Sequence, residues 1–219
     1  MNVQEIALVS IMSAVAVVVS YGKGLATSFL PGLIEFTTVI IFVSGFCFGT
    51  IVGGVVGMLS MTIKMLVPYP FAHPASWIFT ISPILLAVEA LLGGMYGVVG
   101  GFLGKKWSLE NRWKFTLKLS LSGFILTFIY QILSSIGFYL AYPVYPSVWE
   151  AIYLTFIPLY YPYPPIMHAF INPLIFASIG TTLIYAIKRL SFRTGGSMMP
   201  RGTKRTKYKM KDAISSTVS

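Results

Sequence analysis

Long apolar stretches alternate with short polar or proline-rich connections along most of this chain. The six apolar stretches span about 6–21, 31–48, 50–67, 75–104, 116–140 and 166–188. Each is close to the length that a helix needs to cross a hydrocarbon core of about 30 Å. The pattern therefore predicts an all-α membrane protein, a bundle of six transmembrane helices.

Residues 31–67 can be divided into helices in two ways. Four glycines recur there at a spacing of four: Gly45, Gly49, Gly53 and Gly57. Such a row suits a packing stripe on one long, strongly tilted helix. As a single helix, however, the uncharged run from Phe36 to Ile63 would be about 42 Å long, well over the thickness of the core. Length therefore favours two helices with a turn near 48–50, and the regular spacing would then be partly accidental.

Composition and charge agree with a membrane location. The chain is 56% hydrophobic and 10% charged, whereas soluble domains carry about 25% charged residues. A net charge of +10 would suggest nucleic acid in a soluble protein. Here the basic residues gather in 105–118 and from Lys188 onward, as they do in cytoplasmic segments of membrane proteins. We expect no nucleic-acid partner, both termini in the cytoplasm, and a multi-pass location in the plasma membrane.

Domain organisation follows from the same pattern. We expect one membrane domain over 1–192 and a disordered tail over 193–219, rich in Gly, Ser and Lys, that contacts anionic lipid. Proline-rich 66–76 and 141–165 are predicted external loops. Within the second, Ser147–Ile157 is predicted to form a short helix that Ser147 caps. The start of the chain lacks the basic region of a signal peptide, so we expect the first apolar stretch to be retained.

Motifs for catalysis and metal binding do not emerge. Gly100–Lys105 lacks the glycine and the following Ser or Thr that a phosphate-binding loop requires. His73 and His168 have no carboxylate at the spacing of a metal site. Cys47 is the lone cysteine, so it has no partner for an intramolecular disulfide. We therefore expect neither an enzyme nor a cofactor.

Polar residues inside the apolar stretches are the candidates for ligand binding. Glu89 lies in the middle of the fourth stretch, where an acid costs about 2.5 kcal/mol or more and usually faces the bundle interior. It could bind a polar group of a substrate or hydrogen-bond within the bundle. Gln131 and Asn172 could bind a ligand or join helices, and His168 lies one helical turn before Asn172. Lys64 could bind an anion or extend to the interface.

Two further groups of residues suggest contacts outside the helices. Trp149 and Tyr163 could stack on a flat ligand or belong to the aromatic belt of a membrane protein. Ala7, Ser10 and Ala14 lie on one face of the first stretch, where small side chains let another helix approach closely. That helix could belong to this bundle or to another subunit.

The second and third stretches resemble those of the S components of energy-coupling factor (ECF) transporters. Glu35-Phe36 corresponds to the acidic start of the second helix in that family, and Phe48-Gly49 to its end. Gly53 and Gly57 correspond to the glycines that open the third helix. Ser10–Ala14 is similar to the Ala-x-x-x-Ala coupling motif of the first helix, with Ser in place of the first Ala.

The resemblance implies a six-helix subunit that captures a vitamin or related micronutrient from outside the cell. The residues expected in the pocket or over it are Glu89, Gln131, Trp149, Tyr163, His168 and Asn172. Ser10 and Ala14 would face a transmembrane coupling subunit, and two ATPase subunits would drive uptake. Two other functions stay open: a proton-coupled secondary transporter that uses Glu89, and a membrane scaffold whose tail binds anionic lipid.

Overall fold

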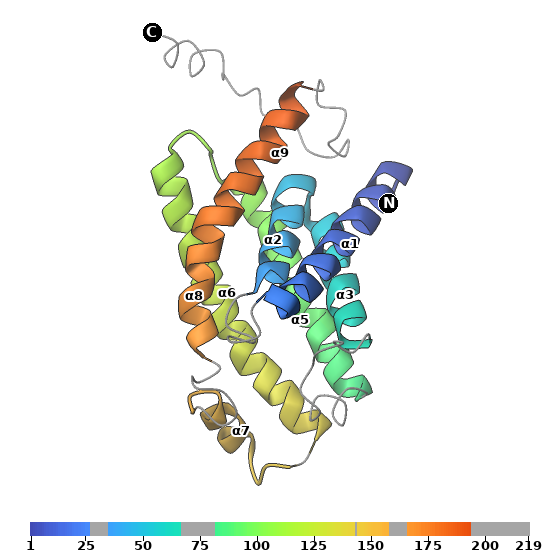
Figure 1. Ribbon diagram of the computed structural model, residues 1–219, viewed down its shortest axis with the longest axis vertical. Helices are drawn as coiled ribbons and strands as arrows, with labels where there is room; N and C mark the ends of the chain where they lie inside the picture. The colour runs from blue at the N-terminus through green and yellow to red at the C-terminus, as the bar shows by residue number, and fades with distance from the viewer. Residues whose placement is uncertain (27–34, 67–81, 143, 158–165, 194–219) are drawn as a thin grey trace.

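The fold is a bundle of helices (Figure 1). The computed structural model describes residues 1–26, 35–66, 82–142, 144–157 and 166–193, and no strand occurs within these ranges. Its elements are α1 (Val3–Ala26), α2 (Phe36–Phe48), α3 (Thr50–Leu66), α5 (Pro83–Lys106), α6 (Arg112–Ala141), α7 (Val148–Leu154), α8 (Met167–Ile175), the π-helical turn η1 (Phe176–Gly180) and α9 (Thr181–Arg193). Because α8, η1 and α9 follow one another without a gap, they act as one long helix. Tyr163 and the tail from residue 194 lie outside the described ranges.

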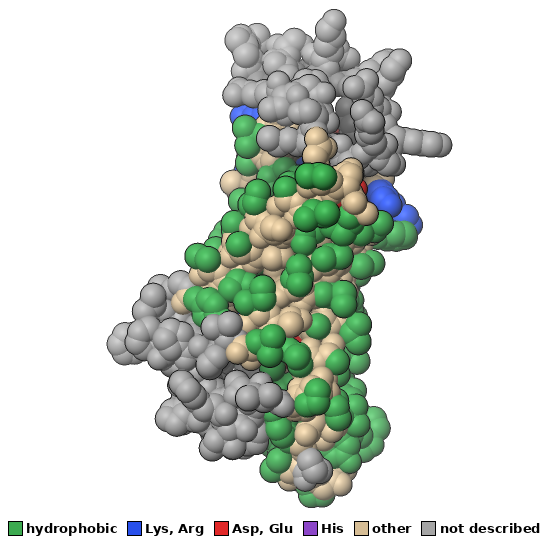
Figure 2. Space-filling model, turned by 90° about the vertical axis from the view of Figure 1, so that its right-hand side faces the viewer, with side chains coloured by type: hydrophobic (Ala, Val, Ile, Leu, Met, Phe, Trp, Pro, Cys, Tyr) green, Lys and Arg blue, Asp and Glu red, His purple; other side chains and the backbone are tan. Residues whose placement is uncertain are grey.

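Several helices are long and apolar enough to cross a membrane. Within the described ranges these are Val3–Tyr21, Pro83–Lys106, Arg112–Ala141 and Met167–Ser191. The apolar helices α2 and α3 are shorter, at 13 and 17 residues. In Figure 2, apolar side chains are spread over the described part of the visible face, and the Lys and Arg side chains seen there lie toward its upper part. This distribution indicates a membrane protein.

The prediction of two helices between residues 31 and 67 is confirmed. Gly49 separates α2 from α3 with a φ of 104°, a conformation that is costly for residues with a Cβ. The start of α2 differs from the prediction, because Glu35 has an extended backbone and its carboxylate accepts from the Thr37 N–H at 3.2 Å. This N-cap makes Phe36 the first helical residue. Residues 31–34, which were expected to extend the helix, lie outside the described ranges.

Three of the four regularly spaced glycines, Gly45, Gly53 and Gly57, lie against the backbone of α5. A Cβ on Gly45 would lie 1.9 Å from the carbonyl oxygen of Gly97, and one on Gly53 would lie 2.6 Å from the same oxygen. A Cβ on Gly57 would lie 2.0 Å from the carbonyl oxygen of Gly93. Helices α2 and α3 therefore both pack backbone to backbone against α5, whereas Gly49 between them forms the turn and has no such contact.

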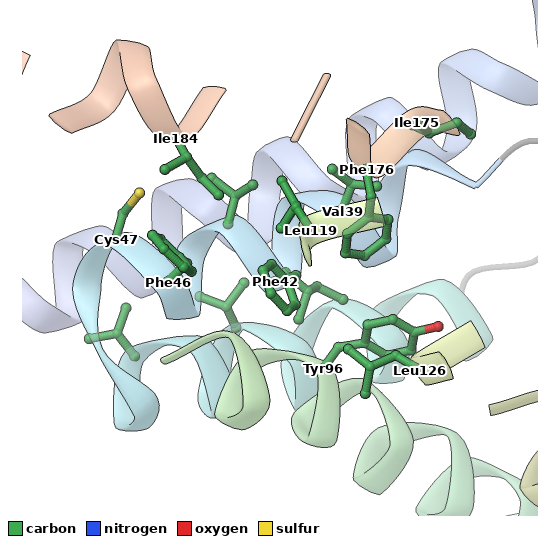
Figure 3. Close-up of a cluster of buried hydrophobic side chains, with 14 of the residues drawn as sticks. Val39, Phe42, Phe46, Cys47, Tyr96, Leu119, Leu126, Ile175, Phe176 and Ile184 are labelled. Carbon is green, nitrogen blue, oxygen red and sulfur yellow. The ribbon is translucent and has the colours of Figure 1, made fainter. Parts of the chain in front are cut away.

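An aromatic core joins this layer to α6 and the last helix (Figure 3). Phe42 of α2 meets Phe176 of η1 edge to face, with ring centroids 5.3 Å apart. Phe46 meets Phe115 of α6 in the same way at 5.6 Å. The Tyr96 ring is fully buried in this core, and its hydroxyl group points out of the apolar cluster in Figure 3.

The two ends of the bundle differ in charge. The Tyr185 hydroxyl of α9 donates to the Leu109 carbonyl at 2.7 Å, which holds the last helix against the connection between α5 and α6. We call this end the basic end, because it carries Lys105, Lys106, Arg112, Lys114 and Lys118. The start of α1 and the end of α9 lie toward this end in Figure 1, and α7 lies at the opposite end.

Helix α7 confirms the predicted short helix and its cap. The Ser147 hydroxyl accepts from the Glu150 N–H at 3.3 Å. The helix ends at Leu154, earlier than the predicted Ile157, because the chain continues into turns from Thr155.

Candidate functional site

Glu89 is a buried acid between α5 and α6, with 6% of its surface exposed. The Tyr130 hydroxyl donates to Glu89 Oε2 and the Ser134 hydroxyl to Oε1, both at 2.5 Å. No basic side chain in the described part of the chain forms an ion pair with this carboxyl group. Because a carboxylate can accept about four hydrogen bonds, Glu89 keeps capacity for a further donor.

Asn172 of α8 hydrogen-bonds to side chains of α2 and α6 inside the bundle. Its side chain is fully buried on α8, and Nδ2 donates to Thr127 Oγ1 at 2.6 Å and to Thr38 Oγ1 at 3.3 Å. The Tyr96 hydroxyl donates to the same Thr127 oxygen at 3.0 Å. The Asn172 Oδ1 atom accepts no hydrogen bond from the described residues. A buried acceptor without a donor costs about 1–3 kcal/mol, so Oδ1 marks a place where a ligand or water donor would be favourable.

A second set of contacts lies one helical turn nearer to α7. The Gln131 Nε2 and His168 Nδ1 atoms are 3.1 Å apart and link α6 to α8. The Ser135 and Thr155 hydroxyl oxygens are 2.6 Å apart, which ties α6 to the chain that follows α7. The Thr155 carbonyl accepts from the Ile166 N–H at 3.0 Å, so the start of α8 is held to the same segment.

An ion pair joins the start of α2 to the end of α3. The Lys64 Nζ atom lies 3.1 Å from Glu35 Oε2, and Glu35 is 7% exposed. Lys64 therefore has a carboxylate partner within the protein, and a ligand anion would have to compete with it.

We call Glu89, Asn172 and the side chains around them the polar cluster. Its members are Thr38, Glu89, Tyr96, Thr127, Tyr130, Gln131, Ser134, His168 and Asn172. All these side chains are buried or partly buried. The ring centroids of Tyr96 and Tyr130 are 6.0 Å apart, so the Glu89 and Asn172 groups form one continuous region. Within it, the Glu89 carboxyl group and the Asn172 Oδ1 atom can accept hydrogen bonds from an incoming group.

The structure brings together four of the residues that were expected in a pocket: Glu89, Gln131, His168 and Asn172. Trp149 lies on α7 with 76% of its surface exposed and makes no contact with the polar cluster that the structure records. Tyr163 falls outside the described ranges.

The small residues of α1 lie apart from this region, on the outside of the bundle. Ala7, Ser10 and Ala14 are all exposed, and the Ser10 hydroxyl donates to the Ile6 carbonyl of its own helix at 3.0 Å. This face of α1 therefore carries small side chains, and the Ser10 hydroxyl is already hydrogen-bonded within the helix. Both features suit a close helix–helix contact.

Sequence reasoning missed several members of the cluster. Thr127, Tyr130 and Ser134 recur at spacings of three and four on α6, which places them on one helix face. That polar face on an apolar helix was a usable signal. Tyr96 offered none, because a tyrosine in an apolar stretch is equally typical of a lipid interface.

Comparison with known protein families, with curated proteins and with solved structures finds no match for this chain. The chemistry of the polar cluster and the distribution of charge are therefore the features that bear on its function.

Proposed function

We propose that this chain is the substrate-binding S component of an energy-coupling factor importer. It would cross the plasma membrane six times with both termini in the cytoplasm, counting α2 and α3 as crossings. It would capture a vitamin or related micronutrient from outside, and separate subunits would supply ATP-driven uptake. The observation that carries the proposal is the polar cluster, and above all the buried Asn172 Oδ1 atom without a donor.

The position of the cluster supports binding from outside. Basic segments of membrane proteins concentrate on the cytoplasmic side, so the basic end would face the cytoplasm. Gln131 and His168 lie on the side of the cluster toward α7, at the opposite end of the bundle. A buried group of ionisable and polar side chains in an apolar bundle commonly marks a substrate path. The cluster would then be reached from the external side.

The chemistry of the cluster suggests how a ligand would be held. Glu89 and the Asn172 Oδ1 atom would accept hydrogen bonds from N–H or O–H groups of the ligand. Gln131 of α6 and His168 of α8 would orient it from the side nearer to α7. Trp149 and Tyr163 would cover it, since both lie in the chain segment between α6 and α8.

The exposed face of α1 supports a partner subunit. Small residues at Ala7, Ser10 and Ala14 would let a helix of a transmembrane coupling subunit approach closely. Two ATPase subunits would bind that subunit and not this chain. Anionic lipid would contact the basic tail.

Ligand retention and calorimetry test the binding function. Protein purified in mild detergent should carry a small molecule that mass spectrometry identifies, and that compound is then titrated into ligand-free protein. Asn172→Ala should weaken its binding at least ten-fold, because it removes a central acceptor and disrupts the Thr127 contact. The matched control is Ser60→Ala, since Ser60 is equally buried but lies outside the polar cluster. Equal affinities of the two variants would exclude Asn172 from the site.

Co-purification tests the coupling function separately. Ala14→Leu should prevent recovery of a complex with the coupling subunit and the ATPases, and it should leave ligand binding intact. Val15→Leu on the neighbouring exposed position is the control and should assemble normally. Normal assembly of Ala14→Leu would contradict the role of this face.

A proton-coupled secondary transporter is the second candidate, and one observation favours it. Glu89 has hydroxyl partners but no ion-pair partner within the described ranges, and buried acids of this kind serve as proton relays in transporters. Uptake by vesicles that contain this chain alone distinguishes the two functions. Transport without any ATPase that stops when the proton gradient is collapsed would favour the secondary transporter.

A further inference from the structure

A groove runs between the first turns of α6 and the junction of η1 with α9. It has a volume of about 460 Å³ and is lined by Arg112, Trp113, Thr116, Ala177, Ser178, Thr181 and Thr182. We call it the α6–α9 groove. It lies at the basic end and shares no residue with the polar cluster. We propose that it binds an anionic phospholipid, with the phosphate at Arg112 and the glycerol and upper acyl chains along the groove.

The walls of the groove combine small size with polarity. The Thr116 and Thr181 hydroxyl oxygens are 3.3 Å apart and form its floor. Ser178 and Thr182 lie at its exposed rim, where their hydroxyls donate to the Leu174 and Ser178 carbonyls at 2.7 and 2.8 Å. Their oxygens keep lone pairs for a donor such as a headgroup hydroxyl. A polar part of a lipid could donate to these exposed hydroxyl oxygens.

Arg112 supplies a positive charge at the mouth of the groove. Its guanidinium carbon lies 5.8 Å from the centroid of the Tyr185 ring, and the bond from Tyr185 to Leu109 holds that ring in place. Arg112 forms no ion pair in the part of the chain that the structure describes. A guanidinium group suits a phosphate well, because its donors match two phosphate oxygens at once.

The depth of the groove matches the headgroup region of a bilayer. Trp113 is 77% exposed, and exposed tryptophans on transmembrane helices prefer the level of the headgroups. Arg112 therefore lies at the phosphate level, and Ser178 lies deeper along the groove. A free phosphate ion would contact Arg112 alone, whereas a phospholipid would also occupy the small-residue part of the groove. The cytoplasmic leaflet, which the basic end would face, is rich in anionic lipid.

Native mass spectrometry of the full chain tests the proposal. The protein is released from detergent micelles with added dioleoyl phosphatidylglycerol or dioleoyl phosphatidylcholine, and the fraction that carries one lipid is measured. Wild type should retain phosphatidylglycerol preferentially. Arg112→Gln should lower its affinity about five-fold, the usual contribution of one basic residue near an anionic surface. Lys114→Gln removes the same charge two residues away and outside the groove, and it should change the affinity less than two-fold.

A second variant tests the groove independently of charge. Ser178→Leu places a larger side chain on the rim and should reduce the retained phosphatidylglycerol at least as much as Arg112→Gln. Equal losses in Arg112→Gln and Lys114→Gln would mean that the basic end attracts lipid without a defined site. Unchanged retention in Ser178→Leu, or displacement of the lipid by millimolar inorganic phosphate, would also overturn the proposal. The result does not depend on the transport function, because no transport or ligand binding is measured.

Discussion

The contact between α3 and α5 makes a sharp prediction about Gly97. A Cβ added there would lie 1.9 Å from the Gly53 carbonyl oxygen, 2.1 Å from the Gly53 carbonyl carbon and 2.7 Å from the Gly54 nitrogen. All three atoms belong to the backbone, so no change of rotamer relieves the overlap. Since real Cβ contacts are essentially never shorter than 3.0 Å, the Gly97→Ala substitution would force the two helices apart by about 1 Å.

The size of the effect follows from two opposing terms. Overpacking of a tight contact costs about 3 kcal/mol when the backbone must shift. Replacement of glycine by alanine within a helix returns about 1 kcal/mol of helix propensity. The net loss for Gly97→Ala is therefore about 2 kcal/mol. For a chain of this length the midpoint of thermal unfolding should fall by about 4–8 °C.

Gly94→Ala on the same helix is the matched control. Its Cβ would meet the Met58 side chain at 3.0 Å and the Gly54 carbonyl oxygen at 3.5 Å. A flexible methionine can move aside, so this variant should be as stable as wild type or slightly more stable. The midpoint of thermal unfolding is measured for wild type, Gly97→Ala and Gly94→Ala in detergent. Size-exclusion chromatography after heating reports the fraction that stays folded. A Gly97→Ala variant that unfolds at or above the wild-type temperature would refute the backbone-to-backbone packing of α3 on α5.

Three further substitutions test the fold, each by unfolding in mixed micelles of sodium dodecyl sulfate and mild detergent. Lys64→Met should lower the stability by about 3 kcal/mol, because it removes the positive charge that lies 3.1 Å from the buried Glu35 carboxylate; the double variant with Glu35→Gln should recover most of that loss, and no recovery would argue against the pair. Gly49→Ala should cost about 1–3 kcal/mol from its backbone conformation alone, with φ 104° and ψ 167°, since nothing lies within 4 Å of the added Cβ; a neutral result would mean a different turn. Thr127→Val keeps the shape but removes the acceptor for Tyr96 and Asn172, so about 2 kcal/mol should be lost, and unchanged stability would contradict these bonds.

Local features of the chain were predictable from the sequence. The apolar stretches indicated membrane helices because a bilayer demands a minimum apolar length. The break at Gly49 followed from length as well, because one helix over the whole run would be too long for the hydrocarbon core. The cap at Ser147 depends on residues three positions apart, and such short-range rules can be read directly along the chain.

The candidate site was predictable only in part. Glu89, Gln131, His168 and Asn172 stood out as polar residues in apolar surroundings, and the structure places them in one region. Their partners did not stand out, because serine, threonine and tyrosine are common in membrane helices whether or not they bind anything.

Contacts between distant segments were decided only by the tertiary structure. Asn172 bonds to Thr38, which is 134 positions away, and no local pattern links the two. The spacing of the glycines in α2 and α3 was visible in the sequence. Their contact with Gly93 and Gly97 was not, because those glycines belong to another helix, α5. The sequence by itself indicated which segments are apolar and long enough to cross a membrane, and that the chain breaks near Gly49, since those properties depend on neighbouring residues. Which helix faces meet, and therefore which polar groups share one cluster, depends on three-dimensional packing that the linear order of residues does not contain.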